Sequence, residues 1–180
     1  MKKQMKLFND SNTAYGGDLL KTRKGRAQPR PLSTKHTMHL ILKSSKAKGE
    51  LSFLRHRKMI DQVINFYAKK YCVDVIKMAN VSNHLHLHIK LSKRHFYFHF
   101  IRVVTGVIAK KMGKEMAKLG SSGKFWDSRP FTRIAIGVRA FLGLQDYIAI
   151  NVLEGMGATR EAAKWLVNRS KSYKVVYGFG

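Results

Sequence analysis

The stretch that decides the fold runs Asn83-His84-Leu85-His86-Leu87-His88-Ile89-Lys90-Leu91, nine residues in which polar and apolar side chains alternate without a break. Such alternation is typical of a β-strand with one face in the core, because successive side chains of a strand point to opposite sides. The three histidines and Lys90 would therefore project together from the other face. Two residues along a strand span about 6.6–7 Å, a separation at which two imidazoles can bind one cation. The stretch predicts a core strand that also offers a metal site; the alternative is a histidine-bearing sheet face in contact with water.

The composition of the 180-residue chain predicts a single domain with a polyanionic partner. Hydrophobic residues make up 44% of it, enough for a sizeable core. Its 35 lysines and arginines outnumber 10 aspartates and glutamates, which gives a formal net charge of +25. So large an excess points to nucleic acid or an acidic membrane surface. No stretch approaches the roughly 18 consecutive apolar residues of a spanning helix, so we favour nucleic acid and expect no membrane.

The single cysteine, Cys72, excludes an internal disulfide and a cysteine-rich zinc site. One cysteine is compatible with a reducing cytoplasm. The apolar setting of Cys72 predicts a small buried side chain.

Residues 1 to 35 read as a flexible basic arm, because they hold few apolar groups and no acidic residue after Asp18. We predict that the cations of this arm contact DNA phosphates, and a solubilising tail is the alternative. The predicted contacts are Lys21, Arg23, Lys24, Arg26 and Arg30.

Periodicity in the rest of the chain predicts the order strand, helix, strand, strand, helix, strand. We expect strands at 38–42, 73–78 and 125–136 in addition to the histidine strand, and amphipathic helices at 50–71 and 94–116. This order fits the split βαβ, ferredoxin-like arrangement of the α+β class, in which an antiparallel sheet carries two helices on one face. The histidines would then lie on the opposite face.

Two further histidines lie in the first predicted strand and just before it. His36 and His39 are three residues apart, which points them to opposite faces of a strand. We therefore do not count them as a ligand pair.

A third helix, predicted at 139–153, carries the other half of the chemistry. Tyr147 and Asn151 lie four residues apart and Glu154 three further on, so the three share one helical face. Asparagine and glutamate offer oxygen atoms suited to a hard divalent cation. The alternative for Tyr147 is a core aromatic residue with a satisfied hydroxyl. A shorter basic helix is expected at 159–169.

Three short stretches follow one another along the chain: Ser82-Asn83-His84-Leu85-His86, Phe125-Trp126-Asp127-Ser128-Arg129 and Tyr147-Ile148-Ala149-Ile150-Asn151. In this order they resemble the His-hydrophobe-His motif, the Phe-Trp stretch and the tyrosine helix of the single-tyrosine HUH transposases, particularly the REP-associated tyrosine transposases and their insertion-sequence relatives. The resemblance covers about residues 36 to 155. His88 stands where relatives usually have an aliphatic residue, and Val152 replaces a proline often found there.

The resemblance implies a DNA transposase that cleaves and rejoins strands through a 5′-phosphotyrosine intermediate. Tyr147 would be the nucleophile, and His84, His86 and Asn151 would hold Mg²⁺ or Mn²⁺. We choose His84 and His86 as the histidine pair because Asn83 precedes them as in the family. The pair His86 and His88 stays open, and Glu154 is either a fourth ligand, a base or a surface ion-pairing residue.

The resemblance also implies single-stranded or hairpin DNA as the partner, with a monomer or homodimer acting in a bacterial-type cytoplasm on the nucleoid. The domains would be the arm, 1–35, a catalytic domain, 36–157, and a basic C-terminal helix and tail, 158–180. Two alternatives remain: a non-catalytic, domesticated nucleic-acid-binding protein on the same fold, and a metal-dependent phosphoesterase that uses water. Besides the arm, the expected DNA contacts are Lys90, Trp126, Arg129 and Arg133.

Overall fold

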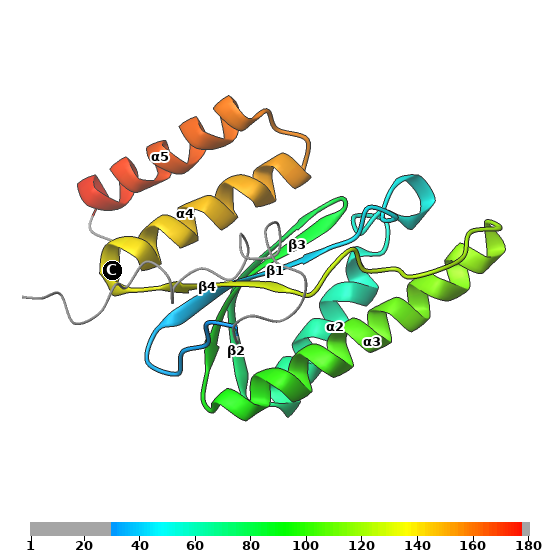
Figure 1. Ribbon diagram of the computed structural model, residues 1–180. Helices are drawn as coiled ribbons and strands as arrows, with labels where there is room; N and C mark the ends of the chain where they lie inside the picture. Colours follow the sequence, from blue (N-terminus) through cyan, green and yellow to red (C-terminus); the bar gives the residue numbers. More distant parts are fainter. Residues whose placement is uncertain (1–29, 178–180) are drawn as a thin grey trace, which may run out of the picture.

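The computed structural model describes residues 30–177, with side chains described up to residue 170. Helices and strands follow the predicted order, including the two helices after the last strand (Figure 1). The elements are β1 (Thr37–Lys43), the short 3-10 helix η2 (Gly49–Leu51), α2 (Arg57–Lys70), β2 (Val73–Val81), β3 (His84–Leu91), α3 (Arg94–Lys118), β4 (Phe131–Ala135), α4 (Gly137–Gly155) and α5 (Arg160–Tyr177).

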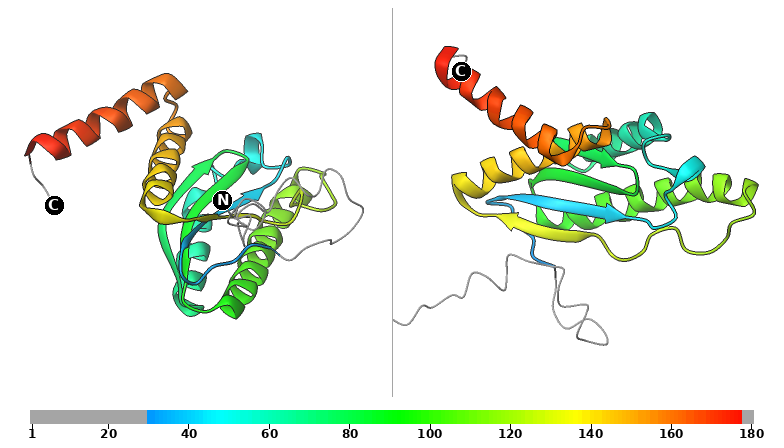
Figure 2. Two further views of the ribbon diagram at one scale, coloured as in Figure 1. Left: turned by 60° about the vertical axis from the view of Figure 1, so that its left-hand side comes forward. Right: turned by 90° about the horizontal axis from the view of Figure 1, so that it is seen from above.

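The four strands form one sheet in the order β2-β3-β1-β4, and every neighbouring pair is antiparallel. Helices α2 and α3 cover one face of this sheet, α4 crosses the other face, and α5 packs on the outer side of α4 (Figures 1 and 2). This confirms the predicted ferredoxin-like sheet with two helices on one face and a tyrosine-bearing helix beyond it.

Strand β3 is buried on both of its faces. Leu85, Leu87 and Ile89 are fully buried in the main apolar core, together with residues of α2 and α3. On the other face His86 and His88 are 2% and 0% exposed. The alternation in the sequence therefore marks a strand between two layers, and the histidine face lies under a helix instead of in water.

The loop before β4 is longer than the sequence predicts, because the strand begins only at Phe131, directly after Pro130. Phe125 and Trp126 lie in this loop and pack in the main core, where both rings contact Phe53. Their apolar character reflects core packing of a loop, which periodicity alone cannot distinguish from a strand.

Three other local predictions differ from the structure. The helix predicted from residue 50 begins at Arg57, because the Phe53 amide donates to the Ser82 carbonyl (2.7 Å) and so ties the preceding segment to the β2–β3 turn. Cys72 is exposed instead of buried, since it forms the turn between α2 and β2 with φ at 49°. The last helix extends to Tyr177, well beyond the predicted end at residue 169.

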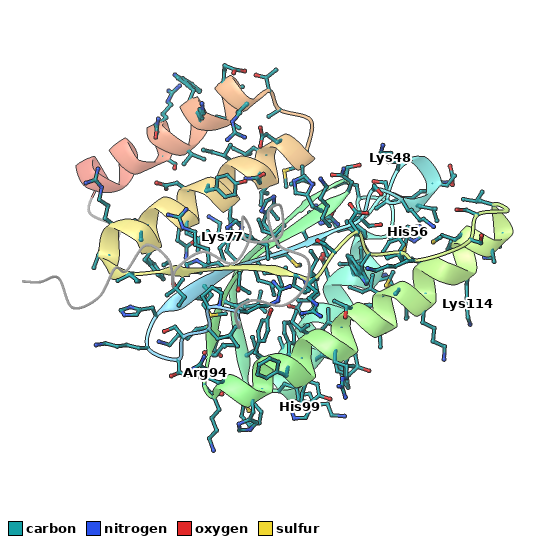
Figure 3. The ribbon with its side chains drawn as sticks, viewed as in Figure 1. Lys48, His56, Lys77, Arg94, His99 and Lys114 are labelled. Carbon is teal, nitrogen blue, oxygen red and sulfur yellow. The ribbon has the colours of Figure 1, made fainter. Side chains whose placement is uncertain are left out.

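Helix α4 lies against β2 as closely as two backbones allow. A Cβ placed on Gly155 would lie 2.5 Å from the carbonyl oxygen of Asn80, a distance that real Cβ atoms do not reach. Lys77 reaches under the same helix from β2, where its Nζ donates to the Gln145 carbonyl at 3.3 Å (Figure 3). These contacts hold α4 across the histidine face.

None of the helices between residues 30 and 177 is long and apolar enough to cross a membrane.

Gly155→Ala should destabilise the protein, because the new methyl group must push α4 away from the β2 backbone. We expect a loss of about 1–3 kcal/mol in the free energy of unfolding measured by urea denaturation. Gly106→Ala is the matched control: this glycine lies in the middle of α3 with nothing within 4 Å of its Cβ position. The control should gain about 0.5–1 kcal/mol from helix propensity. Equal effects of the two substitutions would contradict the close packing of α4.

Candidate active site

The register of the sheet places four histidines and an arginine on one face. His88 of β3 is directly opposite His39 of β1, and His39 is opposite Arg133 of β4. Directly opposed residues in antiparallel strands point to the same side. His84 and His86 share that side by the period of two along β3. The three predicted histidines therefore come together, and β1 adds a fourth.

His84 is oriented by the turn that precedes it. The amides of Ser44 and Phe53 donate to the carbonyls of Asn83 (2.9 Å) and Ser82 (2.7 Å), which fixes this turn against two neighbouring segments. The Asn83 Oδ1 lies 2.6 Å from His84 Nδ1. Because an amide oxygen only accepts, His84 must carry its proton on Nδ1 and donate from there. Its Nε2 is left as the atom that can bind a metal.

His86 shows the same arrangement with a different partner. Its Nδ1 lies 3.0 Å from His39 Nε2, and the two rings stack with centroids 5.2 Å apart. Its Nε2 is buried and has no hydrogen-bond partner within residues 30–177. An unsatisfied buried polar atom costs about 1–3 kcal/mol, so it calls for a ligand. The rings of His84 and His86 have centroids 4.8 Å apart, which suits two imidazoles converging on one ion.

Helix α4 places Tyr147 against the histidines. The Tyr147 ring meets His86 and His39 edge-on, with centroids 5.4 and 5.5 Å away. One turn later Asn151 is 4% exposed, and its Nδ2 donates to the Tyr147 carbonyl at 2.7 Å. With the amide nitrogen engaged, the Asn151 Oδ1 is the atom left for a cation.

The same part of α4 lies over the strands that carry the histidines. Ile148 and Val152, on either side of Asn151, pack in a cluster with Ala79 and Val81 of β2. These two residues are the direct cross-strand neighbours of the histidine pair His84 and His86 in β3. The packing therefore brings the Asn151 segment over this pair.

The environment keeps these imidazoles neutral. Burial lowers the pKa of His86 to about 3, with smaller effects from His39 and His84. Burial, followed by the nearby charges of Arg133 and His88, lowers the pKa of His39 to about 4. The pKa of His84 is also lowered, by burial and then by Lys43. Neutral imidazole is the form that binds metals, so protons would not compete for the site at neutral pH.

The donor set fits a divalent cation bound by two imidazoles and one amide oxygen. No group of three or more His, Cys, Asp or Glu residues suited to a metal occurs in the part of the chain that the structure describes. An ion here would therefore depend on Asn151 as its third protein ligand. The orphaned His86 Nε2 is the structural observation that favours such an ion.

The two alternative ligands lie in different surroundings. His88 is fully buried with no partner for either ring nitrogen within residues 30–177, and its ring centroid is 4.9 Å from that of Phe141. Glu154 forms an ion pair with Arg160 at 3.0 Å. The structure thus gives Glu154 a partner on α5, whereas His88 packs beneath the first half of α4.

A cavity of about 470 Å³ opens beside Tyr147, between α4 and the β1–β4 edge of the sheet. From the sheet it is lined by His39, Phe131 and Arg133. Helix α4 contributes small residues there, among them Ala140 and Gly143. The volume lies in the range of small-molecule sites.

The predicted DNA contacts are spread over the molecule. Arg133 lines the cavity and Arg129 is exposed in the loop before β4. The Lys90 ammonium donates to the Lys35 carbonyl at 2.6 Å. The Trp126 indole N–H donates to the Thr105 carbonyl of α3 at 2.9 Å, which gives this ring a structural role on the other side of the sheet. Arg30 is the first described residue, and Lys21, Arg23, Lys24 and Arg26 lie outside the described residues.

Sequence reasoning missed His39, because it weighed this residue only against His36. The alternation of Thr37, His39 and Ile41 with buried Met38, Leu40 and Leu42 was the available signal for its face. That signal could not show which residue of β3 lies opposite His39.

A family model described as "Transposase IS200 like" matches residues 33–151, which include the four histidines of the site, Tyr147 and Asn151. The chain belongs to this transposase family. Its fold is similar to that of a REP-associated tyrosine transposase solved with a REP hairpin, with a TM-score of 0.57, 13% identity, and 72% of this chain and 74% of that chain covered.

A second solved structure, a protein of Deinococcus radiodurans R1 provisionally assigned as a transposase, has a TM-score of 0.43 and 16% identity, with 70% of this chain and 95% of that chain covered. No curated protein sequence matches the chain.

Acid should destabilise this transposase, in its metal-free form, through the buried histidines. Burial lowers the pKa of His39 and His88 to about 4 and that of His86 to about 3, from 6.5 in the unfolded chain. Below pH 6.5 the unfolded chain therefore binds protons that the folded protein does not. The free energy of unfolding has its full value above pH 6.5, and it decreases as the pH falls toward 4. We expect urea denaturation to show a loss of about 2 kcal/mol for each of the three histidines, roughly 5–7 kcal/mol in all, between pH 7 and pH 4.5.

His88→Leu should make this pH dependence shallower, because it removes one of the titrating groups. His99→Gln is the control, since His99 is exposed on α3, on the side of the molecule away from α4 (Figure 3). A stability that stays constant between pH 7 and pH 4.5 would show that the imidazoles are not buried as neutral groups.

Proposed function

We propose that the transposase cleaves and rejoins single strands of DNA with Tyr147 as the nucleophile. The observation that carries the proposal is the placement of the Tyr147 ring against His86. The Nδ1 atoms of His86 and His84 both form hydrogen bonds, which orients the two rings. A tyrosine that only packed the core would not need imidazoles oriented in this way.

The chemistry proposed for Tyr147 is a transesterification. The phenolic oxygen attacks the scissile phosphorus, the bond from phosphorus to the 3′ oxygen breaks, and that oxygen takes up a proton to become a free 3′-hydroxyl. The protein is left with a 5′-phosphotyrosine link that keeps the energy of the ester for rejoining.

We propose that His84, His86 and Asn151 hold a divalent ion, Mg²⁺ or Mn²⁺, through His84 Nε2, His86 Nε2 and Asn151 Oδ1. When bound, such an ion offsets the negative charge that develops on the phosphoryl oxygens. Two features of the protein support binding of such an ion. The imidazoles are neutral and need not lose a proton first, and α4 covers them, which limits access of water. Glu154 and His88 remain alternative ligands.

We propose that the cavity beside Tyr147 binds the nucleotide next to the scissile phosphate. Phe131 offers a ring on which a base can stack, and Arg133 offers a guanidinium to a phosphate. Both come from β4 and face the same side as His39. A base must be unpaired to enter, which favours single-stranded DNA or the flank of a hairpin.

The remaining basic residues would bind the DNA backbone outside this cavity. We propose Lys90 and Arg129 for this role, together with the cations of the 1–35 arm. A REP hairpin is bound by the REP-associated transposase of similar fold, and we propose hairpin DNA as the partner here as well. Such a protein would act on the bacterial nucleoid, in the cytoplasm, as a monomer or a homodimer.

Tyr147→Phe tests the nucleophile. It keeps the ring that packs against His86 and removes the only oxygen able to form the phosphodiester. Wild-type protein incubated with Mn²⁺ and labelled hairpins that carry randomised single-stranded flanks should give a covalent band on a denaturing gel. Tyr147→Phe should bind the same pool with unchanged affinity and give no band. Tyr71→Phe, a partly buried tyrosine at the end of α2, is the control and should behave as wild type.

Each other result points to a different mechanism. Cleavage that persists in Tyr147→Phe without an adduct would favour attack by water. An adduct mapped by peptide analysis to another tyrosine would overturn the assignment. Tight DNA binding with no cleavage by the wild type would favour the non-catalytic binder.

A further inference from the structure

We propose that His39 is a positioning residue that fixes the tautomer and the ring orientation of His86, so that the Nε2 lone pair of His86 faces the metal site. The inference rests on the proposed role of His86 as a metal ligand. His39 lies on β1, outside the three sequence motifs, and the inference gives it a role in the site.

The hydrogen bond between the two rings allows only two proton arrangements. His39 Nε2 and His86 Nδ1 are 3.0 Å apart, so one of them must donate. A neutral imidazole carries a single N–H. If His86 Nδ1 accepted, its proton would sit on Nε2, and this buried atom would be an N–H group with no acceptor in the described chain and no lone pair for a metal.

The other arrangement resolves this difficulty. His86 then donates from Nδ1 to His39 Nε2, and its own Nε2 keeps a lone pair for the ion. His39 must in turn carry its proton on Nδ1. The hydrogen bond therefore couples the tautomers of the two rings, and only one of the two states can bind a metal.

The neighbouring ligand supports this reading independently. Asn83 Oδ1 holds His84 Nδ1 at 2.6 Å, so the amide oxygen fixes the same tautomer in His84. Each proposed ligand histidine thus has a partner at Nδ1 and, among the described residues, no hydrogen-bond partner at Nε2. Partners of this kind usually fix the ring orientation of a ligating histidine and raise its basicity.

His39 is held in the state that this task requires. Its side chain is 8% exposed, its ring stacks on His86 at an interplanar angle of 22°, and Tyr147 covers it edge-on. The ring is thereby held with its Nε2 toward His86 Nδ1, at 3.0 Å.

The competing explanation is that His39 only fills space beneath Tyr147. Two substitutions separate the explanations. His39→Phe keeps an aromatic ring for stacking but removes the acceptor, whereas His39→Gln loses the ring but can present an amide oxygen to His86 Nδ1. A space-filling residue should tolerate phenylalanine better than glutamine, and a positioning residue should show the opposite order.

The experiment measures Mn²⁺ binding by calorimetry and the tautomer of His86 by long-range ¹H–¹⁵N NMR, on the full chain without DNA. We expect His39→Phe to weaken Mn²⁺ binding about 10–100-fold and His39→Gln to recover most of the loss. In the metal-free protein, His86 should carry its proton on Nδ1 in the wild type and in His39→Gln, and should populate the Nε2-protonated form in His39→Phe. His84→Ala is the control that removes a ligand outright.

Wild-type affinity in His39→Phe, or a larger loss in His39→Gln than in His39→Phe, would overturn the proposal. An Nε2-protonated His86 in the wild type would also overturn it. If the wild type binds no Mn²⁺, the proposed metal site fails, and the NMR comparison still decides whether His39 sets the tautomer. The failure of the inference is therefore distinct from the failure of the proposed function.

Discussion

The packing of α4 directly on the histidine face of the sheet is the constraint on which the site depends. Gly155 leaves no room for a side chain against the Asn80 carbonyl, so α4 crosses the sheet at backbone contact. That contact buries the imidazoles of β3 and β1, lowers their pKa values and holds Tyr147 over them. If α4 lay farther away, water would hydrate the same histidines and leave them close to their ordinary pKa. The helix therefore supplies both the proposed nucleophile and the dry surroundings in which it would work.

A strand that serves as core and as site at once must resolve a conflict between stability and chemistry. One face of β3 stabilises the fold through Leu85, Leu87 and Ile89, which lie in one apolar core with residues of α2 and α3. The other face costs free energy, because His86 and His88 are buried with ring nitrogens that lack partners in the described chain. A bound cation would offset the cost at His86. His88 packs against the Phe141 ring, and neither of its ring nitrogens has a hydrogen-bond partner within residues 30–177.

The fold and half of the site follow from patterns in the sequence, and the other half does not. Alternation in β3 identifies the core and its histidine face, and helical spacing places Tyr147 and Asn151 on one side of α4, because both depend on local geometry. His39 depends on the register between β1 and β3, which is a long-range property. Trp126 was predicted at a DNA surface, but its indole packs in the core and bonds the Thr105 carbonyl, since an aromatic residue in a basic loop has the same local signature in either place. Cys72 is exposed because a turn at positive φ, and not its apolar neighbours, decides its position.

The central claim is that the Nε2 atoms of His84 and His86 are preorganised to bind one divalent ion below α4. Anomalous diffraction at the manganese edge, from crystals soaked in Mn²⁺, tests it most directly. The account predicts a single strong peak about 2.0–2.3 Å from both Nε2 atoms and from Asn151 Oδ1. A peak bound by His88 in place of His84, or no peak near these residues in crystals saturated with Mn²⁺, would contradict it.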